Sequence, residues 1–281
     1  MPKHEAFDLE RLHAALNSRT IGHSIDYHAT VASTMSLARR LAEKGRVRSG
    51  HVVLAEEQSA GKGRRGRSWT APYGRALLAS VLLEPPMIPA FPALLPMAAG
   101  LAVVEAINDV APPVGNALHL KWPNDVLLGK GRFAGKVAGI LVESAFECGT
   151  PAYVILGVGI NVNQTDAELP VVEAHMPKPT SIQSVLGERI DRTELLIALC
   201  LQMERFLDPQ MQPDAILDRW RSRLGMLGKS VAVYAQPDAN VPDFIGIALD
   251  ITPTGQLLVR DADGETHSLA AADVSVRDAD L

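Results

Sequence analysis

The chain has few of the residues that build disulfide frameworks or zinc centres. Its 281 residues include two cysteines, Cys148 and Cys200, which do not form a Cys-x-x-Cys pair. A disulfide-stapled domain and a zinc ribbon are therefore not expected, and two separate thiols are typical of the reducing cytoplasm. Aromatic residues make up 5% of the chain, so a core has to be built mainly from alanine, valine, leucine and isoleucine.

An export signal and an uninterrupted apolar span are also lacking. The first residues, MPKHEAFDLERLHAAL, carry charges where a signal peptide needs an apolar run. Residues 85–104 are free of charge and long enough to cross a bilayer, but five prolines lie among the first twelve of them. A continuous helix can begin only near Pro92 or Pro96. We therefore expect a loop that leads into a buried helix, in a soluble protein with no membrane partner.

A general surplus of positive charge is absent, with one local exception. The formal net charge of −5 argues against broad binding of nucleic acid, which needs a basic face. The stretch GKGRRGR, residues 61–67, nevertheless places four cations and three glycines in seven residues. Glycine lets backbone N–H groups approach a ligand, and arginine binds carboxylate or phosphate with its fork of donors. The stretch predicts an anion-binding loop, with a solvated surface loop or a nucleic-acid-binding arm as alternatives.

The periodicity of apolar residues predicts a large mixed domain followed by a small β domain. Helices are expected at residues 7–17, 34–45, 96–110, 192–207 and 215–224, and strands at 51–58, 75–85, 117–122, 136–146 and 152–163. The helices and strands do not alternate regularly, so the fold class is α+β. Short β-type runs after Gly225 predict a small β-barrel, which divides the chain into residues 1–225 and 226–281.

The motif KWPND, residues 121–125, ends one predicted strand. Pro123 and Asp125 suit a turn, whereas Lys121 and Trp122 are not turn-forming residues. We expect a turn-stabilising role for Asp125.

Two further strands carry residues that an apolar strand does not need. Lys136 opens the strand at 136–146, where it either faces a partly dry pocket and attracts an anion or is simply exposed at the strand end. Gly157 and Gly159, in GVGINVN, either let a ligand approach the backbone or relieve crowding in the sheet. We find no Ser/His/Asp triad and no cluster of His and Cys metal ligands in the sequence.

In this order and spacing, the motifs closely resemble those of the biotin–protein ligase family. The residues that carry the resemblance are AST at 32–34, EQSAGKGRRGRSW at 57–69, KWPND at 121–125, KVAGILVE at 136–143 and GVGINVN at 157–163. Residues 246–277 are similar to the small SH3-like C-terminal domain of that family, so the resemblance covers almost the whole chain.

The resemblance implies a fold and an activity. The fold would be α+β, with a mixed sheet that has helices on one face, like a class II synthetase, and an SH3-like barrel after it. The activity would be ATP-dependent: biotin and ATP, with Mg²⁺ held through the ATP phosphates, give biotinyl-5′-AMP and pyrophosphate. The biotinyl group then passes to one lysine of a biotin carboxyl carrier domain of a biotin-dependent carboxylase. We expect no transcriptional repressor activity, and either a monomer or a homodimer.

The resemblance also implies a set of site residues. Biotin would be bound by Ser33, Thr34, Gln58, Gly61, Lys62, Arg64, Lys136 and Gly159. ATP would be bound by Arg64, Arg65, Arg67, Trp69, Asn124, Lys136 and Asn161. Arg64 and Lys136 would be catalytic, and Trp69 would cover the adenine. Lys62 stands where many relatives have arginine, and it acts either by its side chain or by its backbone. For Asp125, the alternative to stabilising the turn is to position the magnesium or the acceptor lysine.

Two other functions remain open from the sequence. A lipoate ligase or octanoyltransferase shares the catalytic fold, but it is not expected to carry both GKGRRGR and KWPND. A non-catalytic nucleic-acid-binding protein is the other alternative, and the acidic net charge argues against it.

Overall fold

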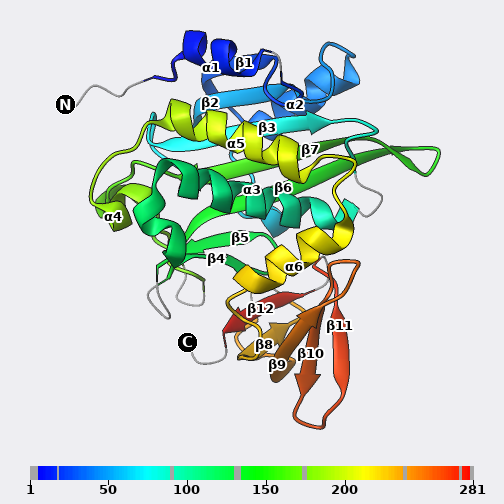
Figure 1. Cartoon of the computed structure of the whole chain (residues 1–281). Coiled ribbons are helices and arrows are strands. Elements are labelled where there is room, and N and C mark those ends of the chain that lie inside the picture. The colour runs from blue at the N-terminus through cyan, green and yellow to red at the C-terminus, as the bar shows by residue number, and fades with distance from the viewer. Residues whose placement is uncertain are drawn as a thin grey trace.

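Two β-sheets organise the chain (Figure 1). The structure is a computed structural model, and it describes residues 6–17, 19–88, 92–129, 134–172, 176–236, 239–271 and 274–278. The first sheet has seven strands in the order β1-β2-β3-β7-β6-β5-β4, in which β1 and β2 are parallel and the other pairs antiparallel. Its strands are β1 (Ile25–Val31), β2 (Val52–Gln58), β3 (Ala76–Leu83), β4 (Leu118–Lys121), β5 (Asp125–Leu128), β6 (Gly135–Glu147) and β7 (Thr150–Asn161).

Helices cover both faces of this sheet. They are α1 (Leu9–Leu16), α2 (Thr34–Glu43), α3 (Leu95–Val110), α4 (Ile182–Leu186), α5 (Arg192–Phe206) and α6 (Pro213–Arg223). Side chains alternate between the faces of a strand, so neighbours on β2 enter different cores. Val52 and Leu54 belong to the large core with α3 and α5, whereas Val53 packs with Met35 of α2. The mixed sheet of an α+β fold is confirmed, with one helix, α2, on the second face.

The proline-rich segment before α3 behaves as expected. A short 3-10 turn at Pro92–Leu94 leads into α3, which begins at Leu95 and is buried along most of its length. Within the described residues, every helix is too short or too polar to span a bilayer.

The sequence pattern missed two strands of the first sheet, β1 and β5. Residues 117–122 were expected to form a single strand, but β4 ends at Lys121 and the chain reverses through Trp122–Asn124 into β5. The strand β5 has only four residues, which is too short to show a clear alternation of apolar and polar side chains.

A five-stranded antiparallel sheet forms the C-terminal part, in the order β11-β10-β9-β8-β12. Its strands are β8 (Ser230–Tyr234), β9 (Phe244–Ile251), β10 (Leu257–Asp261), β11 (Thr266–Leu269) and β12 (Ser275–Asp278). Arg221 of α6 joins it to the main part, 2.7 Å from the carboxylate of Asp250 and 2.8 Å from the carbonyl oxygen of Ile251. The boundary that we predict between residues 225 and 226 lies between α6 and β8 and stays a prediction.

A buried ion pair links the first sheet to α5. The carboxylate of Glu56 on β2 is fully buried and lies 2.7 Å from the guanidinium of Arg192, the first residue of α5. The Tyr27 hydroxyl donates to the same carboxylate at 2.9 Å, and burial, with this carboxylate next to it, raises the pKa of Tyr27. Arg192 also donates to the carbonyl oxygen of Ala76 at 3.0 Å. The pair therefore joins β1, β2, β3 and α5 at one point.

Replacing Arg192 is expected to destabilise the protein strongly. The substitution Arg192→Met preserves most of the side-chain volume but leaves the buried Glu56 carboxylate without its cation, at a cost of about 3–5 kcal/mol. The free energy of unfolding, measured in urea, tests this. The matched control is Arg11→Ala, which removes a half-exposed arginine paired with Asp191 and Glu194 and should cost less than about 1 kcal/mol. Equal losses in the two variants would contradict the role of the buried pair.

Candidate active site

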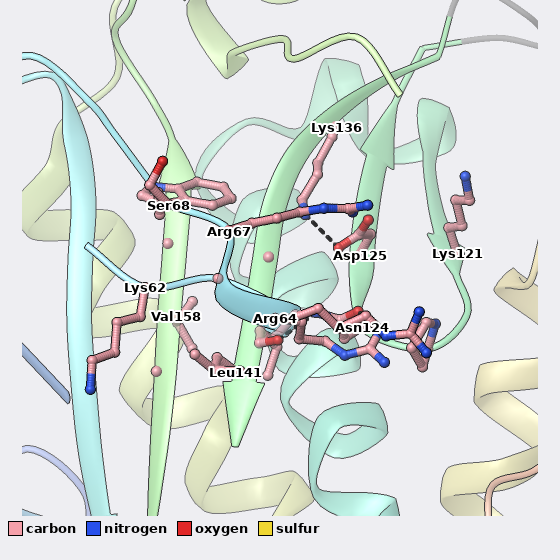
Figure 2. A pocket seen from close by; sticks show the side chains of 18 of the residues that line it. Lys62, Arg64, Arg67, Ser68, Lys121, Asn124, Asp125, Lys136, Leu141 and Val158 are labelled. Atoms are coloured by element: carbon pink, nitrogen blue, oxygen red, sulfur yellow. Dashed lines mark hydrogen bonds and ion pairs between the residues drawn. The ribbon is translucent and has the colours of Figure 1, made fainter. Parts of the chain in front are cut away.

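A pocket lies where the glycine–arginine loop (residues 61–67), the turn between β4 and β5, and strands β6, β7 and β12 meet (Figure 2). Asp125 is the one carboxylate among the described residues that line it. Seven lining side chains are cationic: Lys62, Arg64, Arg65, Arg67, Lys121, Lys136 and Arg277. A chain of net charge −5 thus concentrates positive charge at this one place.

The glycine–arginine loop folds as a small hairpin. Lys62 and Ser68 form an antiparallel bridge, and the N–H of Gly63 donates to the carbonyl oxygen of Arg67 at 2.7 Å. Any side chain at Gly61 would place its Cβ 2.2 Å from the carbonyl oxygen of Trp69. Gly61 lines a second hollow, formed by residues 60–68 with Leu141 and Glu143, and does not line the main pocket. A glycine is therefore needed at position 61 because the two ends of the hairpin come close together there.

Arg64 reaches from the loop to two other parts of the chain. Its guanidinium donates to the side-chain oxygen of Asn124 at 3.0 Å and to the carbonyl oxygen of Ala271, in the C-terminal part. Burial lowers the pKa of Arg64, while the nearby Asp125 acts in the opposite direction. A cation that has lost much of its water gains strongly when an anion comes close.

Lys62 and Arg67 extend in different directions from the same loop. Figure 2 shows Arg67 directed toward Lys136 and Asp125, and Lys62 directed away from them. The ammonium of Lys62 lies 3.8 Å from the carboxylate of Glu143 on β6, which also binds Arg39 of α2. The side chain of Lys62 thus holds the loop to the sheet from outside the cation cluster.

Lys136 lines the pocket at the beginning of β6. Its backbone is held by residues 178–180: its N–H donates to the Lys178 carbonyl oxygen at 2.7 Å and its own carbonyl oxygen accepts from Thr180. Its ammonium lies 2.7 Å from the carboxylate of Asp125 and 5.5 Å from the centre of the Trp69 ring. The carboxylate of Asp125 thus pairs with a residue of the neighbouring strand, which a turn does not require, and its expected role in stabilising the turn stays a prediction.

Glycines form the floor of the pocket. Gly139 of β6 and Gly159 of β7 are directly paired, and the indole of Trp69 lies on both of them. A Cβ at Gly159 would lie 2.6 Å from this ring, so the indole, and not open space for a ligand, explains the glycine. At Gly157 a Cβ would lie 2.6 Å from the sulfur of Met35 in the same way.

The other end of the pocket is polar and buried. Ser33 caps the N-terminus of α2, and Thr34 donates from both its N–H and its hydroxyl to the side-chain oxygen of Gln58, at 2.8 and 3.1 Å. The hydroxyl of Ser80 donates to that of Thr34 at 2.8 Å. Because the oxygen of Gln58 accepts from Thr34, the amide nitrogen of Gln58 is oriented as a donor. This end can bind a small polar group that both donates and accepts.

Asn161 does not line the pocket, contrary to the expectation of a direct ligand contact. Its side chain is 3% exposed, and its amide nitrogen donates to the carbonyl oxygens of Thr180 at 3.0 Å and Lys136 at 3.4 Å. Its oxygen accepts from Gln164 at 2.8 Å. These internal partners occupy the amide, so Asn161 supports the backbone of Lys136 from behind.

The C-terminal part contributes lining residues that the sequence did not predict. They are Val274, Val276 and Arg277. No motif connects these residues to the loop or to KWPND, which precede them by more than 100 positions. Lys121 and Asp125 also line the pocket. They belong to the KWPND motif, but the composition of the turn did not predict that their side chains lie in the pocket.

Sequence profiles of two families match the chain. Residues 27–161 match the profile described as "Biotin/lipoate A/B protein ligase family", and residues 227–277 match "Biotin protein ligase C terminal domain". The first match contains the loop, KWPND and Lys136, and the second contains β8–β12 up to Arg277.

Curated relatives match over most of their length. The chain is 32% identical to the biotin–[acetyl-CoA-carboxylase] ligase of Mycobacterium tuberculosis over 284 residues, which cover 95% of this chain and 98% of the relative. It is 34% identical to the enzyme of the same name from Paracoccus denitrificans, over 79% of this chain and 88% of that one.

A solved structure has the same arrangement of elements. The biotin protein ligase of Aquifex aeolicus in complex with biotin and ATP superposes with a TM-score of 0.72 at 25% identity, over 91% of this chain and 99% of that chain. The profiles, the relatives and the fold agree with the resemblance seen in the motifs. The chain therefore belongs to the biotin protein ligases, within the biotin/lipoate A/B protein ligase family, and is a ligase.

Proposed function

We propose that the chain activates biotin as biotinyl-5′-AMP and transfers it to a lysine of a biotin carboxyl carrier domain. The observation that carries this proposal is a pocket that is polar at the Thr34–Gln58 end, apolar along its glycine floor, and cationic around Lys136. Biotin has a polar ureido ring, an apolar chain and a carboxylate, which match these three regions in that order. ATP supplies the further negative charge that the arginines of the loop would bind.

The reaction has two steps, and both need charge to be held in place. First a carboxylate oxygen of biotin bonds to the α-phosphorus of ATP, and the bond to the bridging oxygen of the β-phosphate breaks, which releases pyrophosphate. Then the neutral amine of the acceptor lysine attacks the acyl carbon, AMP leaves with the electron pair, and the amine loses a proton. In the first step two anions approach each other, so fixed cations supply most of the stabilisation.

Lys136 and Arg64 are the residues to which we assign this stabilisation. Lys136 would exchange its present partner Asp125 for the biotin carboxylate and the α-phosphate, and Arg64 and Arg67 would bind the phosphates. Trp69 and the ammonium of Lys136 lie next to each other on the glycine floor, since a Cβ at Gly139 would be 3.0 Å from the ring and 3.2 Å from the ammonium. Trp69 would cover the adenylate from that side.

Magnesium would enter with the nucleotide. Mg²⁺ is commonly held by one or two carboxylates together with substrate phosphates. Asp125 is the only carboxylate that the described part of the pocket offers, and it is already paired with Lys136. This donor set fits an ion that is bound mainly through the ATP phosphates, with Asp125 as its one protein ligand. When bound, such an ion would neutralise phosphate charge.

Biotin-dependent exchange of pyrophosphate into ATP tests the first step. The purified protein should catalyse exchange with biotin, and exchange with lipoate or octanoate, measured in parallel, should be absent. Exchange driven by lipoate or octanoate would assign the chain to the other branch of the family. No exchange with any of the three acids would contradict the proposed function.

The substitution Lys136→Ala should lower biotin-dependent exchange by about 100- to 1,000-fold, the typical effect of removing one charge-stabilising donor. The matched control is Lys178→Ala, since the Lys178 side chain is exposed while its backbone binds that of Lys136. Unfolding curves should be similar for both variants. Near-native exchange in Lys136→Ala would exclude the assigned role.

Trypsin cleavage after Arg64 and Arg65 reports on the glycine–arginine loop. If the loop closes on ligands, biotin together with ATP should slow this cleavage. Cleavage after Arg46, exposed beyond α2, serves as the internal control and should not change. Equal rates at the loop with and without the ligands would count against closure.

The remaining expectations stay predictions. They are the absence of repressor activity, which a gel-shift assay with promoter DNA can test, and the choice between a monomer and a homodimer.

A further inference from the structure

The C-terminal sheet contacts the KWPND turn directly. The indole nitrogen of Trp122 donates to the carbonyl oxygen of Gly255 at 3.0 Å, and Trp122 is only 2% exposed. Gly255 lies in the turn between β9 and β10, which two hydrogen bonds close: the N–H of Thr252 donates to the Gln256 carbonyl at 2.9 Å, and the N–H of Gly255 donates to the Thr252 carbonyl at 2.9 Å. A rigid turn thus accepts a hydrogen bond from a residue that lines the pocket.

The same turn is held from its other side. Gly255 has φ +81°, and a Cβ there would lie 3.3 Å from the carbonyl oxygen of Ala93 and 3.3 Å from the methyl carbon of Met97, at the start of α3. The turn is therefore lodged between the beginning of α3 and the indole of Trp122. This placement fixes where the acceptor for Trp122 lies.

A closed ring of contacts passes through the pocket. Gly255 accepts from Trp122, and Asn124 follows two residues after Trp122 in the same turn. Asn124 in turn accepts from Arg64 at 3.0 Å. The ring returns to the C-terminal part through the bond from Arg64 to Ala271. Asp125, which pairs with Lys136, is the next residue after Asn124.

We propose that Trp122 is a positioning residue, which uses its hydrogen bond to Gly255 to set Asn124 and, through Asn124, the phosphate-binding Arg64. The C-terminal sheet is then a structural part of the phosphate-binding side of the site. The biotin end does not depend on this bond, because Ser33, Thr34 and Gln58 lie on α2 and β2. This inference rests on the proposed function for its assay.

The test compares two tryptophans that are both buried. Trp122→Phe removes the hydrogen bond to Gly255, whereas Trp220→Phe removes a fully buried indole whose nitrogen makes no hydrogen bond to the described residues. In the exchange assay, Trp122→Phe should raise the KM for ATP about five- to tenfold, the change expected for one hydrogen bond. The KM for biotin should not change, and Trp220→Phe should leave both values unaltered.

A second variant approaches the contact from the other side. Gly255→Ala is strained at φ +81° and presses on Ala93 and Met97, so it should also raise the KM for ATP alone. If both substitutions act through one contact, the KM for ATP of the double variant should be no higher than that of the more affected single variant. If the fold-increase in the KM for ATP of the double variant equals the product of the two single increases, the two residues act separately and the proposal is overturned.

The rise in Tm caused by ATP gives a readout without turnover, since a ligand that binds the folded state stabilises it. The rise should be smaller in Trp122→Phe than in Trp220→Phe. Equal rises, or an increase of both KM values in Trp122→Phe, would show a merely structural role. Absence of biotin-dependent exchange in the unmodified protein would instead reject the proposed function, and the ATP-induced Tm shifts would still decide the role of Trp122.

Discussion

The pocket is lined by one carboxylate, that of Asp125, and by seven cationic side chains, and this unbalanced charge is the constraint on which the site depends. Like charges about 4 Å apart near a protein surface repel by roughly 4 kcal/mol, so cations do not gather without support. The chain has to hold them by other contacts until an anion arrives. The arrangement of the loop, the sheet and the C-terminal part can be understood as that support.

The support comes from opposite sides of the glycine–arginine loop. Lys62 binds Glu143 on β6, outside the cation cluster, while Arg64 binds Asn124 and the backbone of Ala271. Lys136 is fixed by its backbone contacts to residues 178–180 and by Asp125. Each of these contacts holds a cation near its place, and Asp125 is the one partner that an arriving anion would replace. Such preorganised charge is what stabilises the approach of two anions.

The apolar parts of the site follow from close packing. Trp69 can lie flat on the sheet only because Gly139 and Gly159 have no side chains, and the sulfur of Met35 fills the space above Gly157. Below this floor, α3 and α5 bury the opposite face of the sheet, and the Glu56–Arg192 pair holds α5 to β2. A rigid sheet therefore carries a loop whose own hydrogen bonds are few and local.

Local patterns in the sequence were sufficient for the main elements and motifs. Apolar periodicity located β2, β3, β6, β7 and the long helices, and the spacing of GKGRRGR, KWPND and Lys136 identified the family. Short β5 was missed because four residues carry too little periodicity, and β1 was missed as well. The elements and motifs that were found depend on residues close to one another in the sequence, which is why they can be predicted without a structure.

Contacts between distant residues were decided only by the tertiary structure. The pairing of Asp125 with Lys136, the internal role of Asn161, and the contribution of Val274, Val276 and Arg277 have no local signature. An amide or a carboxylate side chain can bind a ligand or another part of the chain, and the local sequence around it looks the same in both cases. Which partner it meets depends on how the two sheets pack, and that packing is a property of the whole chain.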